Sequence, residues 1–342
     1  ILLLDTIHRY INIKMKKKIN VALIGSNFAL KGYLPVIEKI KHLNLKIICS
    51  RNILKNNNIS GYSKELSFEN NWKKIFKKNI DLVICSVPPL VQQKILIYNL
   101  KYKKKIIFEK PISCNYLKSK DIVKKLKEKK ISCDVNLTFL SHPLFIKTQS
   151  IVKKKILGKV ISYKIKWSVV SQDLNKKVKS WKTNESQGGG IKNIFLTHVF
   201  SYCDFFFGNT KLKKFKFTTV NFKKLKYKDK VNCFIENPKS ISGEINIYTK
   251  QKGLQNHSIN IFFEKGYLEL STRSTDWTKD FKLKIFQKHN NKAKQYKLID
   301  NQKFKDGRSN QIYLLFAKFL KRSNYLNIDY CLNAEKNTHK II

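Results

Sequence analysis

The stretch Lys104–Ser113, KKIIFEKPIS, ends an apolar run in two opposite charges, Glu109 and Lys110. Packing does not require such charges at the end of a buried strand, whereas open α/β sheets bind their ligands at the carboxyl ends of strands. A lysine there can donate hydrogen bonds to ligand hydroxyls, and its cation can stabilise a developing alkoxide. Pro111 fixes the following turn, for which a cis peptide bond is one solution. A surface ion pair is the alternative reading of this segment.

A second segment whose residues could bind a ligand is the loop Gly25–Leu30 in INVALIGSNFALKGYLP. A strand leads into Gly25, and the N-terminus of the following helix offers N–H groups and a partial positive charge to a phosphate. Dinucleotide-binding turns usually carry three glycines, but here Asn27 and Leu30 replace the second and third. Asn27 is the next-best residue where φ must be positive. We expect this loop to suffice for binding without guaranteeing catalysis; a plain turn with no ligand is the alternative.

His198 lies in the pattern FLTHVFSY, shortly after the glycine triplet Gly188–Gly190. A neutral imidazole can take a hydroxyl proton as hydride leaves the same carbon, or return the proton in the reverse direction. The glycines permit a close approach of backbone. From the residues alone, a structural histidine on an apolar helix is the alternative. Trp181 is either a wall of the substrate pocket or a core side chain.

The first 138 residues alternate short apolar runs with lysine-rich helical patterns. Continuous apolar strands separated by helices are typical of a parallel sheet covered on both faces. We therefore expect a doubly wound Rossmann domain of the α/β class over residues 15–138. The predicted strands are Ile19–Ile24, Leu45–Cys49, Leu82–Ser86, Lys105–Phe108 and Ile131–Leu137, and the predicted helices are Ala29–Lys41, Trp72–Phe76, Val91–Leu100 and Tyr116–Lys129.

From Pro143 the pattern changes. One more helix, Leu144–Ile156, precedes several strand-like stretches without intervening helices, which favours an antiparallel sheet. Two late helices, Asn310–Leu320 and one around Tyr330–Ile341, close the chain. We expect an α+β domain with a large, mostly antiparallel sheet over residues 139–342, serving substrate binding and oligomerisation. Residues 1–14 precede Met15, the only methionine, and are expected to be a non-native or disordered extension.

The net charge of +47 is carried by lysines, because the chain has only five arginines. Arginine is the usual base reader and phosphate clamp, and the lysines are spread along the whole chain, so we expect solvated faces and no nucleic-acid partner. Seven cysteines without metal-type spacing predict reduced thiols in a cytoplasmic protein and no metal site. No apolar run approaches the ~18–20 residues of a membrane span.

Several of these motifs occur together in one known family. Gly25 after a strand, SVPPLVQ at Ser86–Gln92, EKP at Glu109–Pro111, and GGG at Gly188–Gly190 followed by THV resemble the Gfo/Idh/MocA family. Its members are nicotinamide-dependent oxidoreductases that act mainly on sugars, cyclic polyols and sugar nucleotides. The resemblance runs from about Lys18 to Gly208. Beyond that it survives only as a pattern, of which DGRSNQIYLLFAKFLK is the clearest part.

The resemblance implies an NADP or NAD cofactor with its pyrophosphate at Gly25–Leu30. The adenosine ribose would lie near Ser50 and Arg51, where the absence of an acidic residue favours NADP; stacking on adenine is another role for Arg51. Lys110 and His198 would be the catalytic residues. The implied cofactor contacts are Gly25, Ser26, Asn27, Phe28, Ala29, Ser50, Arg51, Ser86, Pro88, Gln92, Glu109 and Lys110, and the implied substrate contacts are Trp181, Gly189 and Thr197.

The chain departs from the family pattern near the expected site. Ile194 stands where many members carry an Asp four residues before the histidine, and Leu140 replaces a frequent basic residue. With Asn27 and Leu30, these changes affect catalysis more than cofactor binding. We expect a cytoplasmic NAD(P)-dependent oxidoreductase that moves hydride between nicotinamide C4 and a carbinol carbon of a sugar-like substrate, as a dimer or tetramer. The alternative is a catalytically degenerate nucleotide-binding sensor or regulatory protein.

Overall fold

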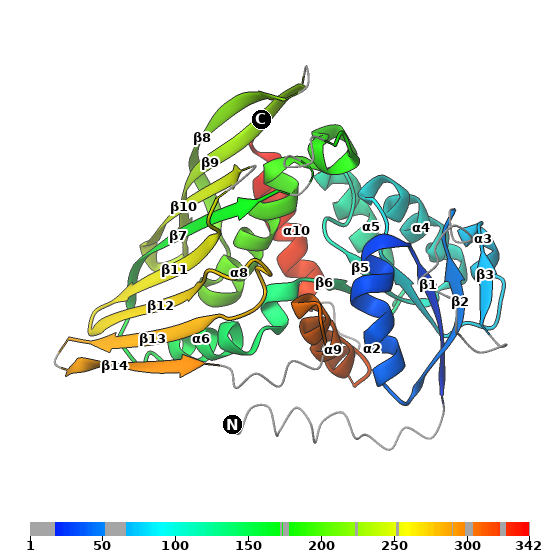
Figure 1. Cartoon of the computed structure of the whole chain (residues 1–342), viewed down its shortest axis with the longest axis horizontal. Helices are drawn as coiled ribbons and strands as arrows, with labels where there is room; N and C mark the ends of the chain where they lie inside the picture. The colour runs from blue at the N-terminus through cyan, green and yellow to red at the C-terminus, as the bar shows by residue number, and fades with distance from the viewer. Residues whose placement is uncertain are drawn as a thin grey trace. The chain divides into compact units, whose positions relative to one another are not determined.

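The computed structural model describes residues 18–51, 66–171, 173, 178–222, 225–250, 253–288, 290–297, 304–321 and 326–341. The chain divides into two compact units, one of residues 1–136 and 302–329 and the other of residues 137–301 and 330–342 (Figure 1). The return of residues 302–329 to the first unit is not predicted by the sequence, and the expected boundary after residue 138 stays a prediction. The expectation for residues 1–14 lies outside the described residues.

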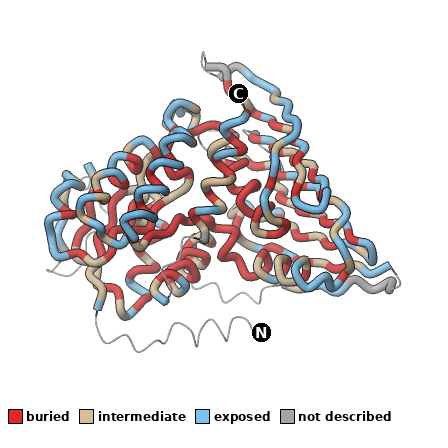
Figure 2. The backbone as a smooth tube through the Cα atoms, turned by 180° about the vertical axis from the view of Figure 1, so that it is seen from behind, coloured by how far each residue is buried: buried red, intermediate tan, exposed pale blue. Residues whose placement is uncertain are grey.

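The first unit contains a six-stranded, wholly parallel sheet of order β3-β2-β1-β4-β5-β6. This confirms the doubly wound sheet. Strands β4 and β6 are buried at every residue, and Figure 2 shows the buried stretches of the backbone. The burial of β4 follows from its apolar run, whereas β6 also buries Asp134 and Asn136. The strands are β1 (Ile19–Ile24), β2 (Leu43–Cys49), β3 (Ser67–Glu69), β4 (Leu82–Cys85), β5 (Lys105–Glu109) and β6 (Cys133–Asn136).

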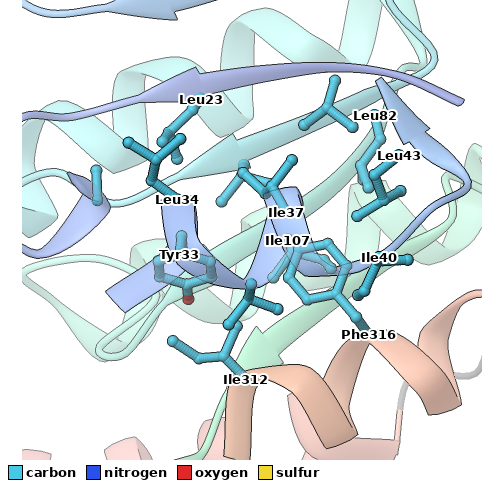
Figure 3. Close-up of a cluster of buried hydrophobic side chains, with 14 of the residues drawn as sticks. Leu23, Tyr33, Leu34, Ile37, Ile40, Leu43, Leu82, Ile107, Ile312 and Phe316 are labelled. Atoms are coloured by element: carbon cyan, nitrogen blue, oxygen red, sulfur yellow. The ribbon is translucent and has the colours of Figure 1, made fainter. Parts of the chain in front are cut away.

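Helices cover this sheet, and the last of them comes from the end of the chain. Helix α9 packs against α2, and Figure 3 shows Ile312 and Phe316 of α9 beside Tyr33 and Ile37. Asp306 begins α9 by accepting a hydrogen bond from the Arg308 N–H. The helical elements are η1 (Ala29–Tyr33, π-helical), α2 (Leu34–Lys39), α3 (Trp72–Ile75), α4 (Pro89–Tyr102), α5 (Tyr116–Glu128) and α9 (Gly307–Phe319).

The second unit contains an eight-stranded sheet of order β14-β13-β12-β11-β7-β10-β9-β8. Every neighbouring pair is antiparallel except β7 and β10, which confirms the mostly antiparallel expectation. The strands are β7 (Val160–Val170), β8 (Lys211–Phe222), β9 (Leu225–Asn237), β10 (Ile241–Lys250), β11 (Asn256–Phe263), β12 (Gly266–Thr272), β13 (Lys282–Gln287) and β14 (Asn290–Lys297).

One face of this sheet is buried. On β7, Tyr163, Ile165 and Trp167 are buried while the residues between them are not, which is the period-two pattern of a strand covered on one side. The helical elements of this unit are η4 (Thr138–Ser141), α6 (Pro143–Lys153), η5 (Trp181–Thr183), η6 (Glu185–Gln187), η7 (Lys192–Leu196, π-helical), α8 (Thr197–Phe207), η8 (Pro238–Ser240) and most of α10 (Leu326–His339).

Candidate active site

The carboxyl ends of the parallel strands bring several predicted cofactor residues to one edge of the first unit. The Gly25 N–H donates to the Cys49 carbonyl at 2.9 Å, and the Ser86 N–H donates to the Ile24 carbonyl at 2.8 Å. The ends of β1, β2 and β4 are thus linked directly through backbone. This edge is where open α/β sheets bind ligands, and it includes the point where the strand order reverses.

Gly25 is required by the geometry of this edge. Its φ is +132°, and a Cβ atom there would lie 2.2 Å from the Ser86 carbonyl oxygen. The backbone therefore passes so closely that no side chain fits, and the helical turn that starts at Asn27 follows at once. Such a cradle followed by a helix N-terminus fits a pyrophosphate group.

The expectation for Asn27 needs correction. Asn27 is exposed and helical, and its φ is not positive. The position therefore makes no conformational demand for glycine, and the asparagine is accommodated without strain. Leu30 lies within the π-helical turn, is partly buried and packs against the apolar cluster beneath the helix.

Ser50 and Arg51 follow β2 at the same edge. The Ser50 N–H donates to the Glu69 carbonyl at 3.0 Å, and Arg51 is exposed. Glu69 ends β3 and was missed by sequence reasoning, because β3 is short and its neighbours give no strand signal. Its carboxylate lies 2.7 Å from Lys78 Nζ, and that hydrogen bond lowers the pKa of Glu69. The acidic side chain at the end of β3 is thus already paired with a lysine.

Ser86 and Pro88, between β4 and α4, are partly exposed, whereas Gln92, on the first turn of α4, is buried. The Gln92 side chain is 1% exposed, and its carboxamide binds the backbone of the turn after β5 rather than pointing into solvent. A direct contact of Gln92 with a cofactor stays a prediction.

Glu109 is held at the end of β5 by two donors. Tyr33 Oη donates to Glu109 Oε1 at 2.5 Å, and Asn136 Nδ2 donates to the same oxygen at 2.9 Å. Burial raises the pKa of Glu109, while these hydrogen bonds and the cations of Lys110 and Arg308 act in the opposite direction. The Lys110–Pro111 peptide bond is cis, and Lys110 is partly exposed at the same edge.

Arg308 is a residue of this edge that sequence reasoning missed. Its guanidinium lies 4.1 Å from the centroid of the Phe28 ring, and it makes two hydrogen bonds to the Asp306 carboxylate, at 2.9 and 2.6 Å. The end of the chain therefore adds a cation beside the predicted phosphate loop. The signal in the sequence is the DGR motif, which the resemblance treats only as a part of the family tail.

His198 lies near the start of α8 in the second unit and is 5% exposed. Aromatic rings surround it: the ring centroids lie 5.3 Å away for Phe139, 5.7 Å for Trp277 and 6.4 Å for Trp167. Phe139 and Trp167 are buried, whereas Trp277 is partly exposed. This packing fixes the plane of the imidazole. Neither Phe139 nor Trp277 was predicted, because they come from distant segments.

The glycine triplet packs against the segment that carries Trp181. A Cβ atom on Gly189 would lie 2.1 Å from the Trp181 carbonyl oxygen, so the close approach expected of the triplet is present. Thr197 is fully buried, and its hydroxyl donates to the Lys192 carbonyl at 3.4 Å. Substrate contacts by Trp181, Gly189 and Thr197 stay predictions.

Lys110 belongs to the first unit and His198 to the second, so their shared role in one site also stays a prediction. Within the described ranges, no group of three histidine, cysteine or acidic side chains could hold a metal ion. None of the helices that the structure describes is long and apolar enough to cross a membrane.

Known proteins resemble this chain in both sequence and fold. An uncharacterised oxidoreductase of Synechocystis is 19% identical over 279 residues, which cover 78% of this chain and 75% of that protein. The fold resembles that of a 3-ketoreductase from Actinomadura kijaniata in complex with NADP and TDP-benzene, with a TM-score of 0.75, 14% identity and coverage of 93% and 95% of the two chains.

A levoglucosan dehydrogenase in complex with NADH and L-sorbose superposes with a TM-score of 0.78 at 14% identity, covering 95% of this chain and 97% of that one. The model of an oxidoreductase family with an NAD-binding Rossmann fold matches residues 19–137, and the model of its C-terminal alpha/beta domain matches residues 149–336. The chain therefore belongs to the Gfo/Idh/MocA family of oxidoreductases.

Proposed function

We propose that the protein is an NAD(P)-dependent oxidoreductase that interconverts a carbinol and a carbonyl carbon on a sugar, cyclic polyol or sugar nucleotide. One observation supports this most: the Gly25 cradle, too tight for any side chain, lies at the same strand edge as Glu109 and Lys110. A phosphate-bearing cofactor across that edge would bring its reactive end within reach of the lysine.

In the proposed reaction, one residue would stabilise the developing charge and another would transfer the proton. When bound, the nicotinamide supplies or accepts the hydride. Lys110 would donate hydrogen bonds to the substrate hydroxyl and lower the free energy of the developing alkoxide. His198, whose plane is fixed by aromatic packing, would accept the hydroxyl proton or return it. Glu109, held by Tyr33 and Asn136, would keep the lysine-bearing turn in place.

We propose NADP rather than NAD as the preferred cofactor. Arg51 is exposed directly after β2, and Glu69, the acidic side chain at the neighbouring strand end, is paired with Lys78. A 2′-phosphate would be attracted by the arginine. The Glu69 carboxylate, which could otherwise accept from both ribose hydroxyls of NAD, is already paired with Lys78. The sugar-like substrate class agrees with the sugar and TDP ligands of the similar structures.

A catalytically degenerate nucleotide sensor is the second candidate. Leu140, in place of a frequent basic residue, is buried at 3% exposure, and Ile194 gives His198 no carboxylate four residues upstream. The experiment that separates the candidates is a fluorescence titration with NADPH and NADH, followed by a turnover assay on a panel of keto sugars and sugar nucleotides. Binding with turnover supports the enzyme, binding without turnover supports the sensor, and no binding contradicts both.

We also propose a cytoplasmic homo-oligomer that uses the open face of the second unit's sheet. Aromatic side chains lie on this face in two pairs of neighbouring strands. Phe234 on β9 and Tyr248 on β10 are 52% and 42% exposed, and the rings of Tyr267 on β12 and Phe286 on β13 stack at 4.2 Å. Exposed apolar side chains on an open sheet face favour self-association. Light scattering after gel filtration would show a dimer or tetramer, and Phe234→Lys should shift it towards the monomer.

A further inference from the structure

Gln92 makes an unusual set of hydrogen bonds inside the first unit. Its Nε2 lies 2.6 Å from the Glu109 carbonyl oxygen, 2.9 Å from that of Pro111 and 3.2 Å from that of Ile112. Its Oε1 accepts a hydrogen bond from the Glu109 N–H at 2.9 Å. One carboxamide on α4 therefore binds the backbone on both sides of Lys110.

These contacts also determine the positions of the nitrogen and the oxygen in the Gln92 carboxamide. Three carbonyl oxygens surround the nitrogen and one N–H faces the oxygen, so the reverse orientation would oppose acceptor to acceptor and donor to donor. A glutamine supplies both functions in one rigid plane. A carboxylate would lack the donors, and an aliphatic side chain would leave all four backbone groups without this partner.

The backbone that Gln92 holds is the part that carries the proposed catalytic lysine. Lys110 lies between Glu109 and Pro111, and both of these residues are bound by the carboxamide. Because Gln92 is 1% exposed and lies on a regular helix, it is a rigid support for a turn at the sheet edge. A small rotation of this backbone would displace the ammonium at the end of the long lysine side chain, and catalytic groups tolerate little displacement.

We infer that Gln92 is a positioning residue for Lys110, acting through the turn from Glu109 to Ile112, and not a direct contact to the cofactor. The inference rests on the proposed function, because it assigns to Gln92 the placement of a lysine that acts in the chemistry. It changes the role expected from the sequence, where Gln92 lines the middle of the cofactor.

The test compares Gln92→Leu with Gln93→Leu in the full-length protein. Gln93 is the adjacent residue on α4, is also buried, and has a side-chain oxygen without a hydrogen-bond partner within the described part of the chain. We expect Gln92→Leu to lower kcat at least tenfold while the Kd for NADPH changes less than threefold. Gln93→Leu should leave both within twofold.

A second variant, Gln92→Glu, keeps the size of the side chain and gives a readout that a merely structural role would not move. An ionised carboxylate there accepts from Glu109 N–H but repels the three carbonyls, whereas its protonated form regains one donor. We expect kcat of this variant, relative to wild type, to recover as the pH falls. If Gln92→Leu does not fold, this pH profile tests the positioning role of Gln92.

Lys110→Ala, measured beside these variants, separates failure of the inference from failure of the proposed function. Full activity in Lys110→Ala contradicts the proposed function. Loss of activity in Lys110→Ala together with an unchanged kcat in Gln92→Leu, or a flat relative pH profile in Gln92→Glu, overturns the inference alone. A loss of NADPH affinity in Gln92→Leu as large as its loss of kcat restores the direct cofactor contact and also overturns it.

Discussion

Tyr33 Oη donates a 2.5 Å hydrogen bond to Glu109 Oε1, and it thereby joins the helical segment after the glycine loop to the end of β5. The tyrosine ring is fully buried and lies edge-on to Phe28 and Phe316. This hydrogen bond thus connects the proposed phosphate loop and the proposed catalytic turn within one unit.

Tyr33→Phe should destabilise the protein by about 1–3 kcal/mol, because a buried carboxyl group loses its shorter hydrogen bond. The loss of a donor should also raise the pKa of Glu109 further. Urea denaturation measures the stability. Tyr98→Phe, which removes a 3.2 Å bond to Tyr102 on α4, is the control and should change stability by less than about 0.5 kcal/mol. Equal effects of the two substitutions would contradict this account.

Gly25→Ala should abolish dinucleotide binding and destabilise the fold. Its Cβ would lie 2.2 Å from the Ser86 carbonyl oxygen, which is fixed by the sheet, and this adds to the about 1–3 kcal/mol of strain at a positive φ. Gly208→Ala is a matched control: its φ is +78°, but the nearest atom to its Cβ is 3.8 Å away. Thermal unfolding and NADPH titration of both variants separate steric overlap from backbone strain. Similar losses of stability and of NADPH affinity in the two variants would contradict the proposal that the close approach at Gly25 forms the phosphate site.

Arg51→Ala should weaken NADPH binding about tenfold or more and leave NADH binding within twofold, because only the 2′-phosphate needs the cation. Isothermal titration with both dinucleotides measures the difference. Lys124→Ala, on the exposed face of α5, controls for the general loss of positive charge. A parallel loss for both dinucleotides would indicate that Arg51 stacks on adenine.

Asp134→Asn should make stability less dependent on pH. Burial raises the pKa of Asp134 to about 7, so the folded protein retains a proton that the unfolded chain releases near its ordinary value of 3.8. This group therefore destabilises the wild type progressively as the pH rises from about 4 to 7.

Relative to wild type, the stability of Asp134→Asn should increase by roughly 2.6 kcal/mol between pH 5 and pH 8, at 1.36 kcal/mol per pKa unit. Denaturant unfolding at both pH values measures this gain. Asp121→Asn, an exposed residue paired with Lys125, is the control and should show no such trend. A stability difference that does not vary with pH would rule out a raised pKa at Asp134.

Much of the fold follows from local patterns in the sequence. Runs such as Leu82–Cys85 are apolar throughout because both faces of the parallel sheet are covered, and β7 alternates because one face is open. Strand β3 was missed because its three residues are too few to show the alternation of buried and exposed side chains that marks a strand.

The candidate site could be predicted at positions where the local backbone conformation or the end of a strand requires one particular residue type. Gly25 is such a residue, and the EKP turn is marked by charges that end a buried strand. The contacts of Gln92 and Arg308 could not be predicted in this way, because they join segments 17 and 280 residues apart. Such contacts depend on tertiary packing, which the spacing of motifs along the chain does not encode.

The most direct test of the central claim is to measure NADPH affinity and substrate-dependent NADPH oxidation in the same Lys110→Ala preparation, with Lys105→Ala, exposed at the start of β5, as the control. We predict that Lys110→Ala binds NADPH as tightly as wild type but oxidises it at least 100-fold more slowly, while Lys105→Ala matches wild type in both. Equal losses of affinity and rate in Lys110→Ala, or undiminished oxidation, would contradict the account.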